Sequence, residues 1–299
     1  ILVDLAGHTG FNRLPLFAQR LAPVQMTYLG YPDTTGLRAM DYRLVDAITD
    51  PVGEADALAT EELVRFAPVG WAYAPPADAP AVAPPPAAKD GPVTFGCFNN
   101  FAKVSDATLR GWAGVLAAVP GSRLLLKDRA LTQPAQQERV RARFAELGID
   151  GGRIELLGRT SGLAAHLAHY ARMDIALDAF PYHGTTTTCE ALWMGRPVVT
   201  LCGDRHASRV GASLLTAAGH PEWIAEDWAD YTRIAAGLAA DLSMLAKISG
   251  GLRSDMECSP LLDHPRQAAR FGAALRDGWA RWCDESASVP VMFEPMPTR

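Results

Sequence analysis

A run of hydroxylated residues beside a glycine is the part of this sequence best suited to bind an anion. Thr185, Thr186 and Thr187 follow Gly184, and the residues after them have helical composition. The first turn of a helix carries unpaired backbone N–H groups and partial positive charge, so it attracts phosphate. One Ser or Thr side chain is enough to cap a helix. With Thr188 there are four in succession, which favours a phosphate site, and an ordinary helix cap is the alternative interpretation.

Two ionisable residues extend this chemistry. Glu190 lies one helical turn beyond the first threonines, where its carboxylate can accept hydrogen bonds from a ribose diol. Lys103 follows the expected strand 93–98 and a pair of asparagines, and an ammonium group at a strand end can bind a diphosphate. The alternative for Lys103 is a solvated loop lysine. With the threonines, these two residues suggest a nucleotide site.

Three histidines lie close to this stretch in the sequence. His166 and His169 are three residues apart on an expected short helix, and therefore share one face. They are weak candidates for metal ligands, because no acidic partner lies at a fixed spacing. They can also stack on a base or hydrogen-bond to it, or belong to a partly exposed helix face. His183, in the turn before the threonines, is a candidate base, a candidate binding residue or a plain turn residue.

Apolar runs and helical stretches alternate through most of the chain, which predicts an α/β fold with a parallel, doubly wound sheet. Ligands bind such sheets at the carboxyl ends of the strands. The unusual loops all follow expected strands, and they are residues 6–10, 30–36, 99–103, 158–162 and 179–187. The expected strands are 1–5, 24–29, 41–45, 93–98, 123–127, 153–157, 175–177 and 198–201, and the expected helices are 13–21, 106–119, 134–147, 163–170, 207–217, 228–238, 243–247 and 267–283.

A proline-rich segment divides the chain. Residues 74–92 hold seven prolines and show no periodicity, which is typical of a linker or an extended surface loop. Strand–helix alternation resumes after it, so we expect one unit over 1–73 and another over 93–265. Residues 266–299 form a last helix and tail. Its apolar face is expected to carry Ala268, Phe271, Leu275 and Trp279.

Composition narrows the function classes. Hydrophobic residues make up 48% and charged residues 20% of the 299, which is typical of a globular protein. The net charge of −5 argues against nucleic acid or an anionic membrane as the main partner. Five dispersed cysteines fit reduced thiols in the cytoplasm. No G-x-G-x-x-G or Walker loop is present, which argues against a dinucleotide enzyme or an NTPase. The chain opens as if within a strand, and we expect it to be the C-terminal part of something longer.

Several blocks in one order resemble a known family. They are Asp4-Leu-Ala-Gly-His-Thr, Ala22-Pro-Val-Gln, Leu29-Gly-Tyr-Pro-Asp-Thr-Thr-Gly, Met40-Asp-Tyr, Phe98-Asn-Asn with Lys103, Thr185-Thr-Thr, Glu190-Ala-Leu-Trp-Met-Gly-Arg-Pro-Val-Val-Thr and Ala207-Ser-Arg-Val-Gly-Ala-Ser-Leu-Leu. Over most of residues 1–283 the sequence resembles the catalytic region of protein O-GlcNAc transferases.

The resemblance implies two Rossmann-like lobes of the glycosyltransferase-B type, with the first lobe incomplete in this chain. Residues 1–73 are then the C-terminal part of the first lobe, and 93–265 are the lobe that holds UDP-GlcNAc. It also implies inverting transfer of GlcNAc to a Ser or Thr hydroxyl of a protein or peptide, with no metal and no cofactor. The upstream part of the first lobe and helical TPR repeats are expected to precede the chain. Transfer of another sugar, another acceptor, and a non-catalytic nucleotide-sugar-binding fragment are the alternatives.

The resemblance also implies roles for single residues. Lys103 matches the lysine that meets the diphosphate and steadies the departing UDP. Thr186 and Thr187 match phosphate-binding threonines. Gly30 and Pro32 match the loop of the first lobe that faces the donor.

At other positions this sequence departs from the family. Asn100 lies where a glutamine is usual near the pyrophosphate, and Thr185 lies where some members have histidine. Glu190 replaces an aspartate that holds the ribose. His166 matches a histidine that stacks on uracil, and His169 lies where an arginine is common.

Overall fold

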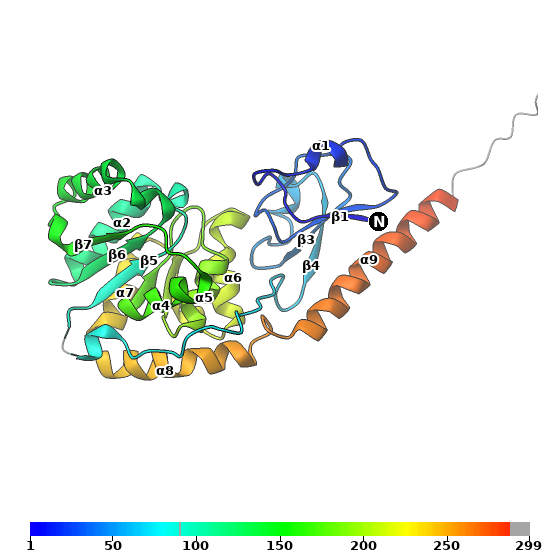
Figure 1. The fold of residues 1–299 in the computed structure, drawn as a ribbon. Helices are drawn as coiled ribbons and strands as arrows, with labels where there is room; N and C mark the ends of the chain where they lie inside the picture. Colours follow the sequence, from blue (N-terminus) through cyan, green and yellow to red (C-terminus); the bar gives the residue numbers. More distant parts are fainter. Residues whose placement is uncertain (90, 288–299) are drawn as a thin grey trace, which may run out of the picture.

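A computed structural model describes residues 1–89 and 91–287, which form two parallel β-sheets with helices around them (Figure 1). The first sheet holds four strands in the order β1-β2-β3-β4. All three neighbouring pairs are parallel. The strands are β1 (Leu2–Asp4), β2 (Gln25–Tyr28), β3 (Tyr42–Asp46) and β4 (Glu62–Phe66). β3 is buried along its whole length, as expected for a central strand.

The second sheet holds six parallel strands in the order β10-β9-β8-β5-β6-β7. The chain leaves β5 in one direction along the sheet and returns beside it at β8, so the topological switch point lies between these two strands. Ligands of doubly wound sheets bind outside the carboxyl ends of the strands at this point. The strands are β5 (Thr94–Cys97), β6 (Arg123–Lys127), β7 (Ile154–Leu157), β8 (Ile175–Leu177), β9 (Val198–Leu201) and β10 (Ile224–Ala225).

Helices cover both faces of the second sheet, and the expected doubly wound α/β lobe is confirmed (Figure 1). The core between the sheet and these helices includes the fully buried side chains of Phe95, Trp112 and Leu124. The helices are α2 (Asp106–Ala118), α3 (Pro134–Glu146), α4 (Leu163–Ala168), α5 (Thr186–Trp193), α6 (Val210–Ala217) and α7 (Trp228–Ala240).

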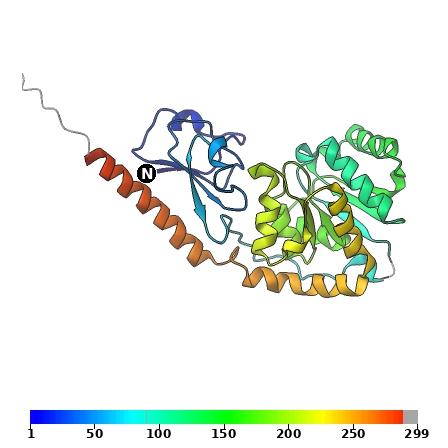
Figure 2. The same cartoon turned by 180° about the vertical axis from the view of Figure 1, so that it is seen from behind.

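The chain then returns to the first lobe. Helix α8 (Leu242–Cys258) lies along the second lobe, and α9 (His264–Ala287) runs diagonally across the first (Figures 1 and 2). Phe271 stacks on Tyr28 of β2, with ring centroids 5.6 Å apart. Gln267 Nε2 donates to the Tyr28 hydroxyl at 2.5 Å. The last helix therefore closes one face of the first sheet.

The predicted lengths of two helices are wrong, and so is part of the predicted apolar face of the last helix. Helix α1 (Leu14–Phe17) is shorter than the expected 13–21, because Arg20 has a positive φ of 50° that ends regular structure. Helix α8 is much longer than the expected 243–247. On α9, Ala268 and Trp279 are exposed, and Ala274 lies in the core instead. Strands β4 and β10 were not singled out.

The described part of the proline-rich segment before residue 90 is held against the second lobe. Arg196 Nη2 donates to the Ala83 carbonyl at 2.6 Å, and Arg253 Nη2 donates to the Pro80 carbonyl at 2.7 Å. Residues 80–83 are therefore fixed on the second lobe by two buried or partly buried arginines, and Pro86–Lys89 form a short 3₁₀ turn. None of the helices within the described residues has the length and apolar character needed to cross a membrane.

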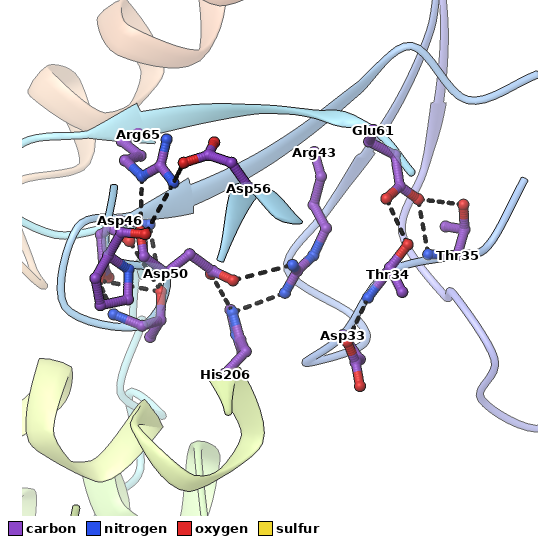
Figure 3. Close-up of polar contacts among 12 residues, drawn as sticks. Asp33, Thr34, Thr35, Arg43, Asp46, Asp50, Asp56, Glu61, Arg65 and His206 are labelled. Carbon is purple, nitrogen blue, oxygen red and sulfur yellow. Dashed lines mark hydrogen bonds and ion pairs between the residues drawn. The ribbon is translucent and has the colours of Figure 1, made fainter. Parts of the chain in front are cut away.

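A buried polar cluster joins the two lobes (Figure 3). His206, which follows β9, points at Asp50 of the first lobe, with 2.5 Å between Nδ1 and Oδ2. The Asp50 carboxylate also pairs with Arg43 of β3 at 3.1 Å. Ser213 of α6 donates to Asp46 Oδ2 at 2.6 Å. These contacts fix how the lobes face each other and so shape the space between them.

Candidate functional site

A cavity of about 530 Å³ lies between the lobes, outside the carboxyl ends of β5 and β8. The second lobe contributes side chains from the loops after these two strands, and the first lobe contributes the loop after β2. Most of the residues expected to bind a nucleotide sugar therefore face one space. The predicted residues that line it are Gly30, Pro32, Asn100, Lys103, Thr185, Thr186 and Thr187.

Lys103 ends a short 3₁₀ turn, Phe101–Lys103, that the Asn100 side chain caps by accepting from Ala102 N at 3.0 Å. Its Nζ donates to the His183 carbonyl at 2.8 Å and lies 4.1 Å from the centroid of the Tyr182 ring. Burial lowers the pKa of Lys103, and the charge of Asp178 opposes this shift. Within the described part of the chain Lys103 forms no ion pair, so its charge remains available to an anion.

The threonines begin helix α5. Thr185 is the N-cap residue, but its side chain makes no capping hydrogen bond, so the ordinary-cap interpretation is wrong for this residue. Thr186 is exposed at the first helical position. Thr187 Oγ1 donates to Asn99 Oδ1. Thr188 Oγ1 turns inward and donates to the Gly184 carbonyl at 3.0 Å. The helix start thus offers backbone N–H groups and the hydroxyls of Thr185 and Thr186 to the cavity.

Asp178 holds the turn between β8 and α5 in place. Its Oδ1 accepts from Gly184 N at 2.8 Å and from Asn99 Nδ2 at 2.9 Å, which ties together the loops that follow β8 and β5. Thr200 Oγ1 donates to Oδ2 at 3.0 Å. Gly184 is required here, because a Cβ would collide with the Asn99 and Thr187 side chains.

His183 is a structural turn residue. The Gly211 N–H donates to Nδ1 at 2.9 Å, so Nε2 carries the proton and donates to the Leu201 carbonyl, also at 2.9 Å. The ring is fully buried, and burial lowers its pKa, which keeps the imidazole neutral. With both nitrogens occupied, His183 is not a base or a ligand contact.

The first lobe supplies the opposite wall. Gly30 tolerates no side chain, because a Cβ would collide with the Leu5 carbonyl. Trp71 and Tyr73 also line the cavity, although the sequence did not single them out. Their position just before the proline-rich segment was the one feature of the sequence that could have marked Trp71 and Tyr73 as cavity residues.

Three predicted donor-binding residues lie outside the cavity lining. His166 Nε2 is 3.1 Å from Glu190 Oε2, and the Tyr170 hydroxyl donates to the same oxygen at 3.1 Å. His169 Nε2 is 3.1 Å from Thr160 Oγ1. Burial and the charge of Lys127 lower the pKa of His169. These groups form a second polar cluster on the same lobe. Among residues 1–89 and 91–287, no three His, Cys, Asp or Glu side chains gather as metal ligands.

Comparisons with known proteins agree with the expected resemblance. Residues 1–69 and 87–270 match the model of glycosyl transferase family 41. A relative from Arabidopsis thaliana, named "Probable UDP-N-acetylglucosamine--peptide N-acetylglucosaminyltransferase SPINDLY", is 42% identical over 283 residues, which are 95% of this chain and 31% of the relative. A second Arabidopsis relative has the same enzyme name followed by SEC. It is 29% identical, and the match spans 98% of this chain and 30% of the relative. The chain thus spans about a third of the length of these relatives.

Solved structures show the same architecture. A mutant of Thermobaculum terrenum O-GlcNAc transferase superposes with a TM-score of 0.89 at 40% identity, over 95% of this chain and 54% of that one. Sucrose-phosphate synthase from Thermosynechococcus elongatus shares the fold at 17% identity, with a TM-score of 0.53 over 81% of this chain and 59% of that one. The predicted pair of Rossmann-like, glycosyltransferase-B lobes is confirmed, and the chain belongs to glycosyl transferase family 41.

Proposed function

We propose that the chain binds UDP-GlcNAc and takes part in transferring GlcNAc to Ser or Thr hydroxyls of proteins, with inversion and without a metal ion or other cofactor. The observation that carries this proposal is the meeting of Lys103 and the start of α5 in one cavity at the topological switch point. The names of the relatives support the donor and the acceptor class.

The proposed chemistry rests on charge. As the sugar leaves the nucleotide, negative charge grows on the diphosphate, and groups already placed to meet that charge lower the barrier. The His183 carbonyl and the Tyr182 ring fix the Lys103 ammonium before any ligand binds. The N-terminus of α5 adds N–H donors and its partial positive charge. Together they can replace a metal ion at the leaving group.

We assign Glu190, His166 and His169 to the end of the binding site that holds the nucleoside. Glu190 Oε2 is occupied by His166 and Tyr170, whereas no described residue hydrogen-bonds to Oε1. That oxygen can accept from a ribose hydroxyl. His166 offers an aromatic ring for a base, and Thr160 holds His169 beside it.

The partners of this proposal are the donor, a protein acceptor, and the further first-lobe and helical-repeat segments of a longer protein. We place the reaction in the cytoplasm, in keeping with five scattered cysteines that form no disulfide within the described residues.

Two measurements test the proposal. Titration calorimetry compares UDP, UDP-GlcNAc and other nucleotide sugars as ligands of this chain, and we expect saturable UDP binding that survives EDTA. Release of UDP with and without an acceptor peptide, measured on the natural full-length protein, then tests transfer. UDP binding with no GlcNAc transfer, or with transfer of a different sugar, would replace the proposed function with one of its alternatives.

A further inference from the structure

A buried lysine outside the proposed chemistry lies beside the nucleoside end of the site. Lys127 ends strand β6 and is only 7% exposed. It forms no ion pair with any carboxylate in the described part of the chain. Its Nζ lies 2.8 Å from His166 Nδ1 and 5.8 Å from the centroid of the Phe98 ring. Burial lowers the pKa of Lys127, although the charges of Glu190 and Asp128 oppose the shift. A buried cation without an ion pair is costly, so a specific use for it is expected.

The contact fixes the tautomer of His166. An ammonium group is a hydrogen-bond donor only, so Nδ1 of His166 must accept. The ring proton then lies on Nε2, which donates to Glu190 Oε2 at 3.1 Å. The Tyr170 hydroxyl donates to the same oxygen. A single directed chain of hydrogen bonds therefore runs from Lys127 through His166 to Glu190.

These hydrogen-bonded residues lie next to the proposed phosphate site, which is formed by Lys103 and the start of α5. Lys127 is at the carboxyl end of β6, which pairs with β5, the strand that precedes Lys103. Glu190 lies one turn along α5 from Thr186. His166 comes from α4, so three separate elements meet at Glu190 and its neighbours. Hydrogen-bond partners behind a binding group orient it, and the loss of such a partner weakens binding although it never touches the ligand.

We propose that Lys127 is a positioning residue for the nucleoside part of the donor. It holds His166 in the Nε2–H tautomer, and His166 in turn orients the Glu190 carboxylate and presents its own ring to a base. The inference rests on the proposed function for its ligand, but the link from Lys127 to His166 is independent of it. The opposing interpretation is a lysine that contributes to stability alone.

The test compares two ligands that use different ends of the site. UDP uses both ends, whereas inorganic pyrophosphate uses only the Lys103 and α5 end. In Lys127→Met we expect UDP affinity to fall about tenfold or more, by analogy with the tenfold to hundredfold loss seen when partners behind metal ligands are removed. Pyrophosphate affinity should change less than about twofold, and Lys127→Arg, which keeps a donor cation, should retain UDP binding. Lys247→Met, an exposed lysine on α8, is the matched control.

A spectroscopic readout separates positioning from stability. The ¹⁵N shifts of the His166 ring, assigned by their loss in His166→Gln, should report the Nε2–H tautomer in the parent and a tautomer mixture in Lys127→Met. Lys127→Leu, which also removes the donor, serves as the second variant where Lys127→Met does not fold. Unchanged UDP affinity with an unchanged tautomer would overturn the inference, and so would a parallel loss of UDP and pyrophosphate binding. If the parent binds no UDP, the proposed function fails, while the tautomer measurement still decides the link between Lys127 and His166.

Discussion

The Lys103 ammonium donates a hydrogen bond to the backbone carbonyl of His183, across 2.8 Å. This contact joins the loop after β5 to the loop after β8, the two strands that flank the switch point. The His183 ring is in turn held by β9 and α6 through its two nitrogens. The position of the cation therefore depends on buried groups of the sheet and not on a flexible loop.

The first prediction concerns the cation itself. Lys103→Ala should lower transfer by the full-length protein at least about a hundredfold, the usual cost of removing one group that meets transition-state charge. Lys103 is only partly buried, so the fold should remain intact. Initial rates of UDP release and a thermal unfolding curve check both points, with Lys247→Ala as the control. Parent-like turnover by the folded variant would remove Lys103 from the mechanism.

The second prediction separates neighbouring threonines. Thr186→Val removes an exposed hydroxyl at the start of α5 and should weaken UDP binding about tenfold, because a hydrogen bond to a charged group contributes about 1.5–3 kcal/mol. Its melting temperature should not change. Thr188→Val removes the inward bond to the Gly184 carbonyl and should lower the melting temperature by several degrees. Equal effects of both variants on stability and affinity would show that the hydroxyls have no separate roles.

Much of the phosphate end could be predicted from sequence because it is local. Apolar runs end in Asp178 and in the Asn99–Asn100 pair, and parallel strands bring their carboxyl ends to one edge. The tautomer of His183 could not be predicted, because its partners Leu201 and Gly211 come from later elements. A sequence pattern shows which edge of the sheet a side chain lies at. It does not show which backbone group from a distant part of the chain forms a hydrogen bond with that side chain.

The third prediction is a loss of stability on mild acidification. Burial lowers the pKa of both His183 and His206 below the ordinary 6.5, so the folded chain takes up fewer protons than the unfolded chain below that pH. Stability then rises with pH through this window, and between pH 5.5 and 7.5 each histidine can account for at most about 1.4 kcal/mol, the limit for a group that stays neutral in the folded chain.

Urea unfolding of the parent and of His206→Gln at both pH values measures this effect. Stability should rise less with pH in the variant than in the parent, while His183 and His169, whose pKa values are also lowered, keep part of the dependence. Asp50 does not contribute in this window. Burial alone would raise its pKa, but His206 and Arg43 lower it overall, so its contribution is lost only in stronger acid. A pH dependence that is identical in parent and variant would contradict the assignment to His206.

The fourth prediction tests the return of α9 to the first sheet. A Cβ on Gly278 would lie 2.5 Å from Met26 Cε and 3.2 Å from Tyr42, so Gly278→Leu should push the helix away from β2 and β3. Overpacking of this kind typically costs about 1–3 kcal/mol. The same change at Gly272, where the nearest atom is Arg276 Nη1 at 3.4 Å, should not destabilise the chain, because Leu also has the higher helix propensity. Chemical denaturation of both variants measures the difference, and equal stabilities would contradict the packing of α9.

The long helices were the hardest elements to predict. Ser249 and two following glycines lower the helix propensity in the middle of α8, so only residues 243–247 were expected to be helical. Leu252 and Met256 are nevertheless fully buried, and their packing overrides the local preference. On α9 the face that meets the sheet carries Ala274 and Gly278, so Trp279 is exposed although its spacing fits the apolar stripe.

Calorimetric titration of this chain with UDP tests the central claim most directly, since the claim is that Lys103 and the start of α5 together form a diphosphate site. We predict a saturable isotherm with one site per chain, weakened at least about tenfold in Lys103→Ala, the factor that corresponds to about 1.4 kcal/mol. An isotherm with no heat and no saturation, or one that Lys103→Ala leaves unchanged, would contradict it.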